Sequence, residues 1–135
     1  ATLTSDQFDR LGPDGVNPYN YLTLVLVGTT SDAATNNPSV LKVQEADTTD
    51  ASNFADITAL VGDGTGGFTV PNSPTATTTA PFFVANIDWK RRKRYMRVLV
   101  SPVTTQTFSL LGILSRASES PTNTTNINAA VVVNL

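Results

Sequence analysis

Six short apolar segments, separated by clusters of turn-forming residues, constrain the fold of this chain more than any other feature. Runs rich in Val, Ile, Leu, Tyr and Phe are typical of strands, and the Gly, Pro, Asn and Asp that follow them are typical of turns. The pattern predicts an all-β fold, an antiparallel β-sandwich or jelly-roll-like single domain with extended N- and C-terminal arms. The predicted strands cover residues 21–27, 40–46, 82–87, 95–100, 106–116 and 129–135.

Two of these segments carry apolar side chains on both faces. Residues 21–27 are apolar at almost every position, and within residues 106–116 the side chain of Leu110 faces opposite to those of Leu111 and Ile113. A strand that is apolar on both faces lies at the centre of a sheet or under a second layer. Because a small domain struggles to cover several such strands, we expect a homo-oligomer in which subunit contacts complete their burial.

The two ends of the chain differ from its middle. We expect an N-terminal arm over residues 1–20, a β-sandwich domain over residues 21–117, and a C-terminal linker with a terminal strand over residues 118–135. The terminal strand is apolar and has no charged side chain, so it pairs either with its own sheet or with the sheet edge of a neighbouring subunit. Both alternatives stay open at this point. The candidate partner contacts in this strand are Val131, Val132 and Val133.

Composition removes several classes of function. The chain has no Cys and no His, which excludes disulfides, thiolate nucleophiles, Ser-His-Asp triads and imidazole or thiolate metal sites. Its longest apolar run is too short to cross a bilayer. Its first residues lack the basic and apolar regions of a signal peptide, which is typical of a chain made inside the cell with its first Met removed. We predict no catalytic residues, no enzyme activity and no cofactor.

Six of the nine basic residues lie in one stretch, residues 90–97. Such a run beside Trp89 is typical of a nucleic-acid patch or of a basic processing site, but the net charge of −2 argues against strong binding to nucleic acid. Salt bridges to an acidic neighbouring subunit and a solvated, protected sheet edge are the other interpretations. We expect the run to serve attachment to a partner rather than folding. Its candidate contact residues are Arg91, Arg92, Arg94 and Arg97.

Two further clusters point only weakly to chemistry. The carboxylates of Glu45, Asp47, Asp50 and Asp56 could hold Ca²⁺, but they do not match the twelve-residue calcium loop, and turn-forming bonds to their own backbone explain them better. The Gly-rich stretch 62–67 lacks the Lys-Ser or Lys-Thr that a phosphate-binding loop needs. We interpret it as a turn or hinge and predict no metal site.

Trp89 and residues 54–61 each have two interpretations. The single Trp of the chain is either a platform for a sugar or, as is commoner for a lone Trp, a residue that closes one end of the sandwich core. Residues 54–61 carry apolar side chains at spacings of three and four, so the segment is either one helical turn or a strand.

Four short motifs resemble a family of structural bacteriophage proteins. They are Leu-Lys-Val-Gln-Glu-Ala-Asp at residues 41–47, Phe-Ala-Asp-Ile at 54–57, Arg-Lys-Arg-Tyr-Met-Arg-Val at 92–98 and Leu-Ser-Arg-Ala at 114–117. Over about residues 20–120 the chain is similar to the decoration, or cement, proteins of tailed-bacteriophage heads. The resemblance implies a short β-sandwich or jelly roll on the outside of a capsid, commonly a trimer, with no catalytic residues.

The resemblance also implies the partners. We expect the chain to bind the major capsid protein, to bridge capsomers as a homotrimer, and to bind neither nucleic acid nor membrane. Such a protein is made in the host cytoplasm and ends on the exterior of the virion. The alternative is a carbohydrate- or receptor-binding β-sandwich module, displayed on a virion or secreted. An enzyme has no support, because no pair of general acid and base can be named.

Overall fold

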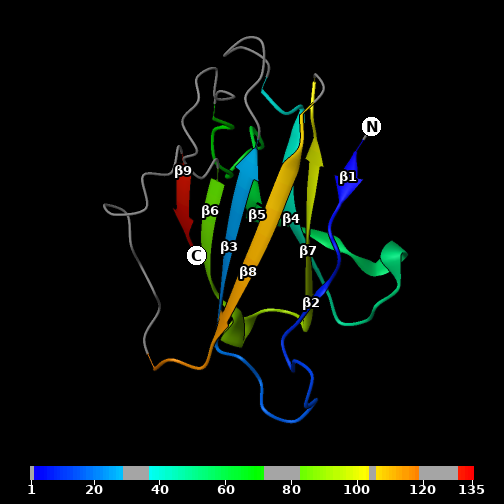
Figure 1. The fold of residues 1–135 in the computed structure, drawn as a ribbon, viewed down its shortest axis with the longest axis vertical. Coiled ribbons are helices and arrows are strands. Elements are labelled where there is room, and N and C mark those ends of the chain that lie inside the picture. The colour runs from blue at the N-terminus through cyan, green and yellow to red at the C-terminus, as the bar shows by residue number, and fades with distance from the viewer. Residues whose placement is uncertain (1, 29–36, 72–82, 104–105, 119–130) are drawn as a thin grey trace.

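Two β-sheets pack face to face around an apolar core in the computed structural model of this chain (Figure 1). The structure describes residues 2–28, 37–71, 83–103, 106–118 and 131–135. The all-β sandwich predicted from the sequence is confirmed, because strands alternate with turns through all of these ranges and the described part contains no α-helix.

The first sheet has five strands in the order β1-β7-β4-β5, with β2 paired to the other end of β7. All of its pairings are antiparallel. The strands are β1 (Leu3–Thr4), β2 (Phe8–Asp9), β4 (Val40–Ala46), β5 (Ala55–Val61) and β7 (Tyr95–Ser101).

The second sheet has four strands in the order β8-β3-β6-β9, so β8 and β9 are its edges. Strands β8, β3 and β6 pair antiparallel, whereas β9 runs parallel to β6. Two single-turn 3-10 helices, η1 (Ala51–Asn53) and η2 (Trp89–Arg91), complete the described elements. The strands are β3 (Tyr21–Gly28), β6 (Phe83–Asp88), β8 (Phe108–Ser115) and β9 (Val131–Asn134).

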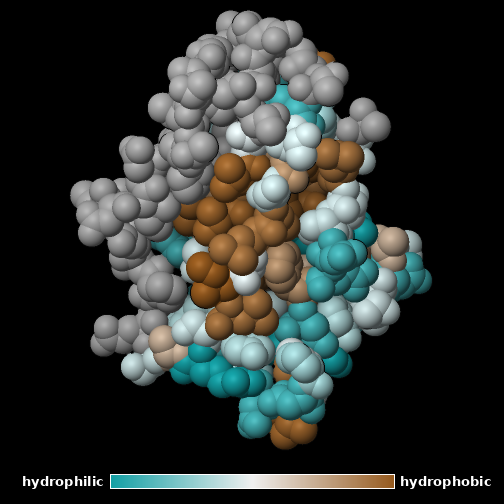
Figure 2. Space-filling view, in the orientation of Figure 1, coloured by the Kyte–Doolittle hydropathy of each residue, from teal (hydrophilic) through white to brown (hydrophobic). Residues whose placement is uncertain are grey.

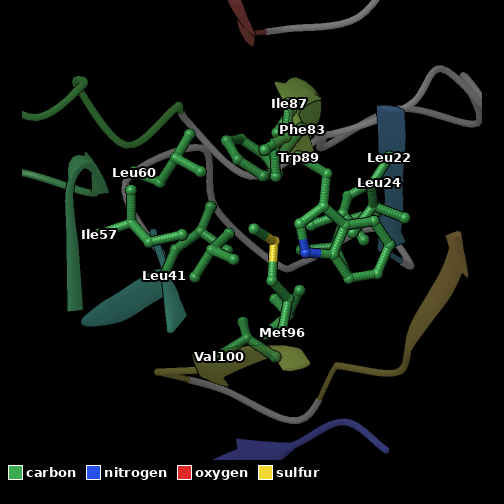
Figure 3. Close-up of a cluster of buried hydrophobic side chains, with 14 of the residues drawn as sticks. Leu22, Leu24, Leu41, Ile57, Leu60, Phe83, Ile87, Trp89, Met96 and Val100 are labelled. Carbon is green, nitrogen blue, oxygen red and sulfur yellow. The ribbon is translucent and has the colours of Figure 1, made fainter. Parts of the chain in front are cut away.

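Strand β3 supplies the middle of the second sheet and the middle of the core. Because side chains alternate along a strand, Leu22, Leu24 and Leu26 all face the first sheet and are buried. They pack with buried side chains of β4 and β7, among them Leu41 and Met96 (Figure 3). The predicted central position of this strand is confirmed, but on its opposite face Thr23, Val25 and Val27 are only half-buried.

Trp89 closes one end of this core. Its side chain is 0% exposed, and its indole N–H donates a hydrogen bond of 2.8 Å to the carbonyl oxygen of Lys93. That bond satisfies the single polar group of the indole, as burial requires. The interpretation of Trp89 as a core residue is confirmed, and a buried Trp has no face on which a sugar could stack.

Strand β5 resolves the ambiguity of residues 54–61 in favour of a strand. Its pairing with β4 is interrupted between Lys42 and Gln44, where the register shifts. Such an irregularity changes the normal two-residue alternation of a strand. It therefore allows Ile57 and Leu60, which are three residues apart, both to be buried in the core.

The expected arms and domain limits need correction. Residues 1–20 are not a free arm, because β1 and β2 pair with β7 and the Ser5 N–H donates 2.9 Å to the Val98 carbonyl oxygen. At the other end, β9 belongs to the second sheet. A polar segment with isolated apolar residues can pair with a sheet edge through backbone hydrogen bonds alone. Its side-chain pattern does not predict such a strand. The sandwich therefore extends beyond residues 21–117 at both ends.

Candidate functional site

The outer face of the second sheet carries exposed apolar side chains. Leu111 and Ile113 of β8 are 58% and 50% exposed, and they lie beside the half-buried Val25 and Val27 of β3. Figure 2 shows this cluster as a brown area over β8 and β3 in the middle of the view. We call these four residues the outer apolar face.

The outer apolar face follows from the composition of two neighbouring strands. The inward positions of β3 and β8 fill the core, and the four outward positions that form the outer apolar face carry apolar side chains where a half-exposed sheet usually carries polar ones. Full burial of a Leu or Ile side chain contributes about 1.5–3 kcal/mol. Roughly half of that contribution remains unused at Leu111 and Ile113, and apolar patches of this kind mark interaction sites.

A polar network borders the outer apolar face on the side of β9. The Thr23 hydroxyl donates 3.0 Å to Asn86 Oδ1, and Asn86 Nδ2 donates 2.8 Å to Asn134 Oδ1. Asn86 is buried, so these bonds satisfy an amide that would otherwise be costly to desolvate. The network fixes three strands side by side and gives the apolar patch a polar rim.

An apolar groove lies under β8, at the open side of the sandwich. It has a volume of about 170 Å³ and is lined by Leu26, Val98, Phe108 and Leu110, with β1 on the opposite side. The volume is small for a drug-sized ligand, whose sites usually span roughly 300–1,000 Å³. The groove is better suited to one or two apolar side chains of another chain.

Phe8 closes the same side of the sandwich further along β8. Its ring lies directly over Gly112, where a Cβ atom would collide with it. The residue that pairs with Phe8 in the first sheet is Met96. Gly112 is therefore required by the close approach of an aromatic ring.

The basic stretch 90–97 is largely engaged within the chain. Arg94 and Asp9 form a two-pronged ion pair, with Nε–Oδ1 and Nη2–Oδ2 distances of 2.9 and 2.8 Å. The hydrogen bonds from Arg94 hold the pKa of Asp9 below its ordinary value. Arg92 lies 3.4 Å from a carboxylate oxygen of Glu45. The acidic partners considered for a neighbouring subunit are thus supplied by the chain itself.

Arg97 is also held in place by the chain. Its Nε donates 2.9 Å to Gln44 Oε1, and its guanidinium lies 4.1 Å from the centre of the Phe54 ring. Of the four candidate arginines, Arg91 is the one whose side chain is exposed and forms no ion pair or hydrogen bond with the described residues. The structure does not bring the four together as one free patch.

Lys90 lies at the same corner of the molecule as Arg91. Its Nζ is 3.0 Å from Tyr21 Oη and 5.0 Å from the centre of the Tyr21 ring. The hydrogen bond to Tyr21 raises the pKa of Lys90 above its ordinary value. Lys90 therefore lies at one end of the second sheet, against the first residue of β3.

The terminal strand pairs within its own chain. Val131, Val132 and Val133 lie opposite Phe83, Val84 and Ala85 in the parallel ladder. The ladder continues past β9, because the Leu135 N–H donates 2.8 Å to the Asn86 carbonyl oxygen. Of the two alternatives left open by the sequence, the structure has the own-sheet pairing, and these three residues support the fold.

The acidic cluster and the Gly-rich stretch have local structural roles. Glu45 accepts a hydrogen bond from the Lys93 N–H, Asp50 caps η1, and Asp56 pairs with Lys42 at 3.0 Å. No group of His, Cys, Asp or Glu that could hold a metal ion occurs within the described ranges. Residues 62–67 form a turn that is closed by an isolated bridge between Gly62 and Phe68.

Sequence reasoning named four arginines and the three valines of the terminal strand as candidate partner contacts, and these remain predictions. Most of these residues are bonded or paired within the chain, and Leu111 and Ile113 were not among the named contacts. The signal was present in the sequence as strands that are apolar on both faces. No helix in the described parts of the chain is both long and apolar enough to span a membrane.

Comparison of the chain with protein-family models, with curated proteins and with solved structures finds no match.

Proposed function

We propose that this chain is a structural protein of a capsid exterior, a decoration protein that stabilises a phage head by bridging neighbouring capsomers. The observation that carries the proposal is the outer apolar face, which exposes Leu111 and Ile113 on an ordered sheet. Exposed apolar patches with polar rims are typical of protein–protein contacts. The resemblance of the sequence to decoration proteins supplies the partner, the major capsid protein, and implies a trimer on the shell.

The shape of the surface favours a protein partner over a small molecule. Small-molecule sites are concave and enclose most of their ligand, whereas the outer apolar face lies on an open sheet (Figure 2). The buried Trp89 leaves the alternative of a sugar-binding module without its aromatic platform. A flat apolar patch on a small sandwich suits a protein that covers part of a larger protein surface.

The test is attachment of the purified chain to shells of the major capsid protein encoded with it. We expect the double variant Leu111→Ser, Ile113→Ser to bind the shells at least about tenfold more weakly, since each 1.4 kcal/mol lost from an interface is a factor of ten. Because both side chains are already about half exposed, each substitution should lower the free energy of unfolding by no more than about 1.5 kcal/mol. Co-sedimentation over a range of concentrations measures the binding.

Val16 offers a matched control. It is also apolar and is 73% exposed, but it lies in the turn before β3 and on neither strand of the outer apolar face. Val16→Ser should decorate shells as well as the parent chain does. Equal decoration by the double variant and the parent chain would contradict the proposal, and so would a loss of binding by Val16→Ser that matches the loss by the double variant.

A further inference from the structure

Strand β8 is an edge strand that lacks the usual protection of an edge. It pairs with β3 over its whole length in one continuous register, and no strand of the described chain pairs with its other side. Edges of stable monomers are commonly blocked by Lys, Pro, a bulge or a very short strand. The eight residues of β8 contain no charged residue and no Pro, and its register contains no bulge. Such an edge is a template for another strand.

The hydrogen bonds of β3 show which backbone groups of β8 point outward. The N–H of Trp89, which follows β6, donates to the Asn20 carbonyl oxygen. Backbone groups of every second residue point to the same side of a strand, so those of Leu22 and Leu24 also point toward β6. The residues between them then face β8 and bond to its odd-numbered positions. The Ser115 carbonyl oxygen, which accepts from the Asn20 N–H, agrees with this assignment. The outward groups therefore belong to Leu110, Gly112 and Leu114.

The sequence of β8 is nearly symmetric about Gly112. Residues 109–115 read Ser-Leu-Leu-Gly-Ile-Leu-Ser, so each residue has a similar one at the same distance on the other side of Gly112. An interface with two-fold symmetry brings residue i of one copy against residue j of the other, and j against i. A strand with this symmetry is complementary to an antiparallel copy of itself.

We propose that β8 pairs antiparallel with β8 of a second copy of this chain, about a two-fold axis at Gly112. The axis brings Leu110 opposite Leu114 of the second copy, and the outward backbone groups of both strands then form about six ladder hydrogen bonds. The two second sheets become one continuous sheet. This contact forms without capsid and does not depend on attachment to it, and it is a two-fold contact separate from the three-fold contact of a trimer on the shell.

Both faces of the joined sheet support this register. On the outer face, Leu111 would lie opposite Ile113 of the second copy, which joins the two outer apolar faces. On the inner face, Leu114 of the second copy would lie beside Leu110, at the apolar groove. A shift by two residues would instead place Ser109 against Ile113 and Gly112 against Leu110. The symmetric register therefore buries the most apolar surface.

Disulfide trapping tests the register, because the chain has no Cys of its own. Chains with Leu111→Cys and chains with Ile113→Cys, which carry tags of different mass, are mixed without capsid and oxidised. Residues directly opposite each other lie within the Cα separation that a disulfide accepts, whereas the diagonal neighbours are about 7–8 Å apart. We expect the mixed 111–113 disulfide to form at least about tenfold faster than either symmetric one.

Val16→Cys is the control for random collision, because this position is more exposed than either strand position. Static light scattering of the cysteine-free chain gives a second measurement. We expect twice the mass of one chain for the parent, and a single-chain mass for Leu111→Lys, which would place a charge into the apolar contact.

Mixed disulfides that form no faster than those of Val16→Cys would overturn the proposal. A single-chain mass for the parent at all concentrations would overturn it as well, and so would an assembly that Leu111→Lys leaves intact. None of these measurements contains capsid, so failure here is separate from failure of attachment to shells.

Discussion

The side chains of the basic stretch 90–97 and those of strand β8 differ in whether they contact the rest of the chain. In the basic stretch, Arg92, Arg94 and Arg97 contact carboxylate, amide and aromatic groups of the same chain. In β8, Leu111 and Ile113 face solvent although both are apolar. The basic stretch, which the sequence suggests as a partner site, has most of its arginines bonded within the chain. Strand β8, whose composition is typical of a core strand, keeps two apolar side chains half-exposed.

Side-chain length explains the difference. An Arg side chain has several rotatable bonds and a planar fork of donors, so it can turn along the surface to a carboxylate such as Asp9. A Leu or Ile on a strand is held by the pleat, which directs alternate side chains to opposite faces. Side chains that cannot reach other groups of the same chain therefore remain available to a partner, whether they are polar or apolar.

The largest expected effect on stability near the basic stretch 90–97 comes from Trp89, which directly precedes it and is buried in the core. Trp89→Ala should lower the free energy of unfolding by about 3–5 kcal/mol, because it empties a filled core site and removes the bond to the Lys93 carbonyl. Leu111→Ala should lower it by no more than about 1.5 kcal/mol, because the side chain is already about half exposed. Urea denaturation followed by far-ultraviolet circular dichroism measures both, since the signal does not depend on Trp. Equal losses would remove the contrast between the two segments.

Much of the fold could be predicted because strands and turns leave a local signature. The segments predicted at 21–27, 40–46 and 95–100 match β3, β4 and β7 to within one residue. Strand β5 could not be assigned, because its two core residues are three apart and only the irregular pairing with β4 explains that spacing. Strands β1 and β2 were missed, since two-residue strands depend on β7 rather than on their own pattern.

The candidate site was predictable only in part. Apolar residues on both faces of residues 106–116 predicted a surface that needs covering, and the structure has such a surface at Leu111 and Ile113. The pairing of Arg94 with Asp9 joins residues 85 positions apart. No local pattern contains a contact of that range, so charge clustering alone could not tell a free arginine from a paired one.

The second effect, in order of size, is the pH dependence that the Arg94–Asp9 pair should impart. Because hydrogen bonds from Arg94 hold the pKa of Asp9 below its ordinary value of 3.8, the pair stabilises the fold above that value. The stabilisation is lost as the pH falls through the lower pKa of the folded state. Arg94→Gln should therefore show a shallower loss of stability with acid than the parent chain. Denaturation midpoints measured from about pH 6 down to about pH 2 test this window.

Asp9→Asn is the control for that series, because it removes the titrating group itself. It should flatten the same part of the profile as Arg94→Gln, and combining the two substitutions should flatten it no further. Identical pH profiles for the parent chain and Arg94→Gln would show that the pair does not stabilise the fold. The basic stretch would then be as free for a partner as β8.

The smallest effect is expected at Arg91, the exposed arginine of the basic stretch 90–97. Arg91→Ser should leave the free energy of unfolding unchanged within about 0.5 kcal/mol. It should slow attachment to capsid shells by about twofold at low salt, and the difference should vanish at higher salt, because exposed charges are screened within about 10 Å at 0.1 M. Arg91→Lys, which keeps the charge, should attach like the parent chain. A larger loss of attachment for Arg91→Ser than for the double variant Leu111→Ser, Ile113→Ser would contradict this comparison. The basic stretch, and not β8, would then contribute most of the binding to the shells.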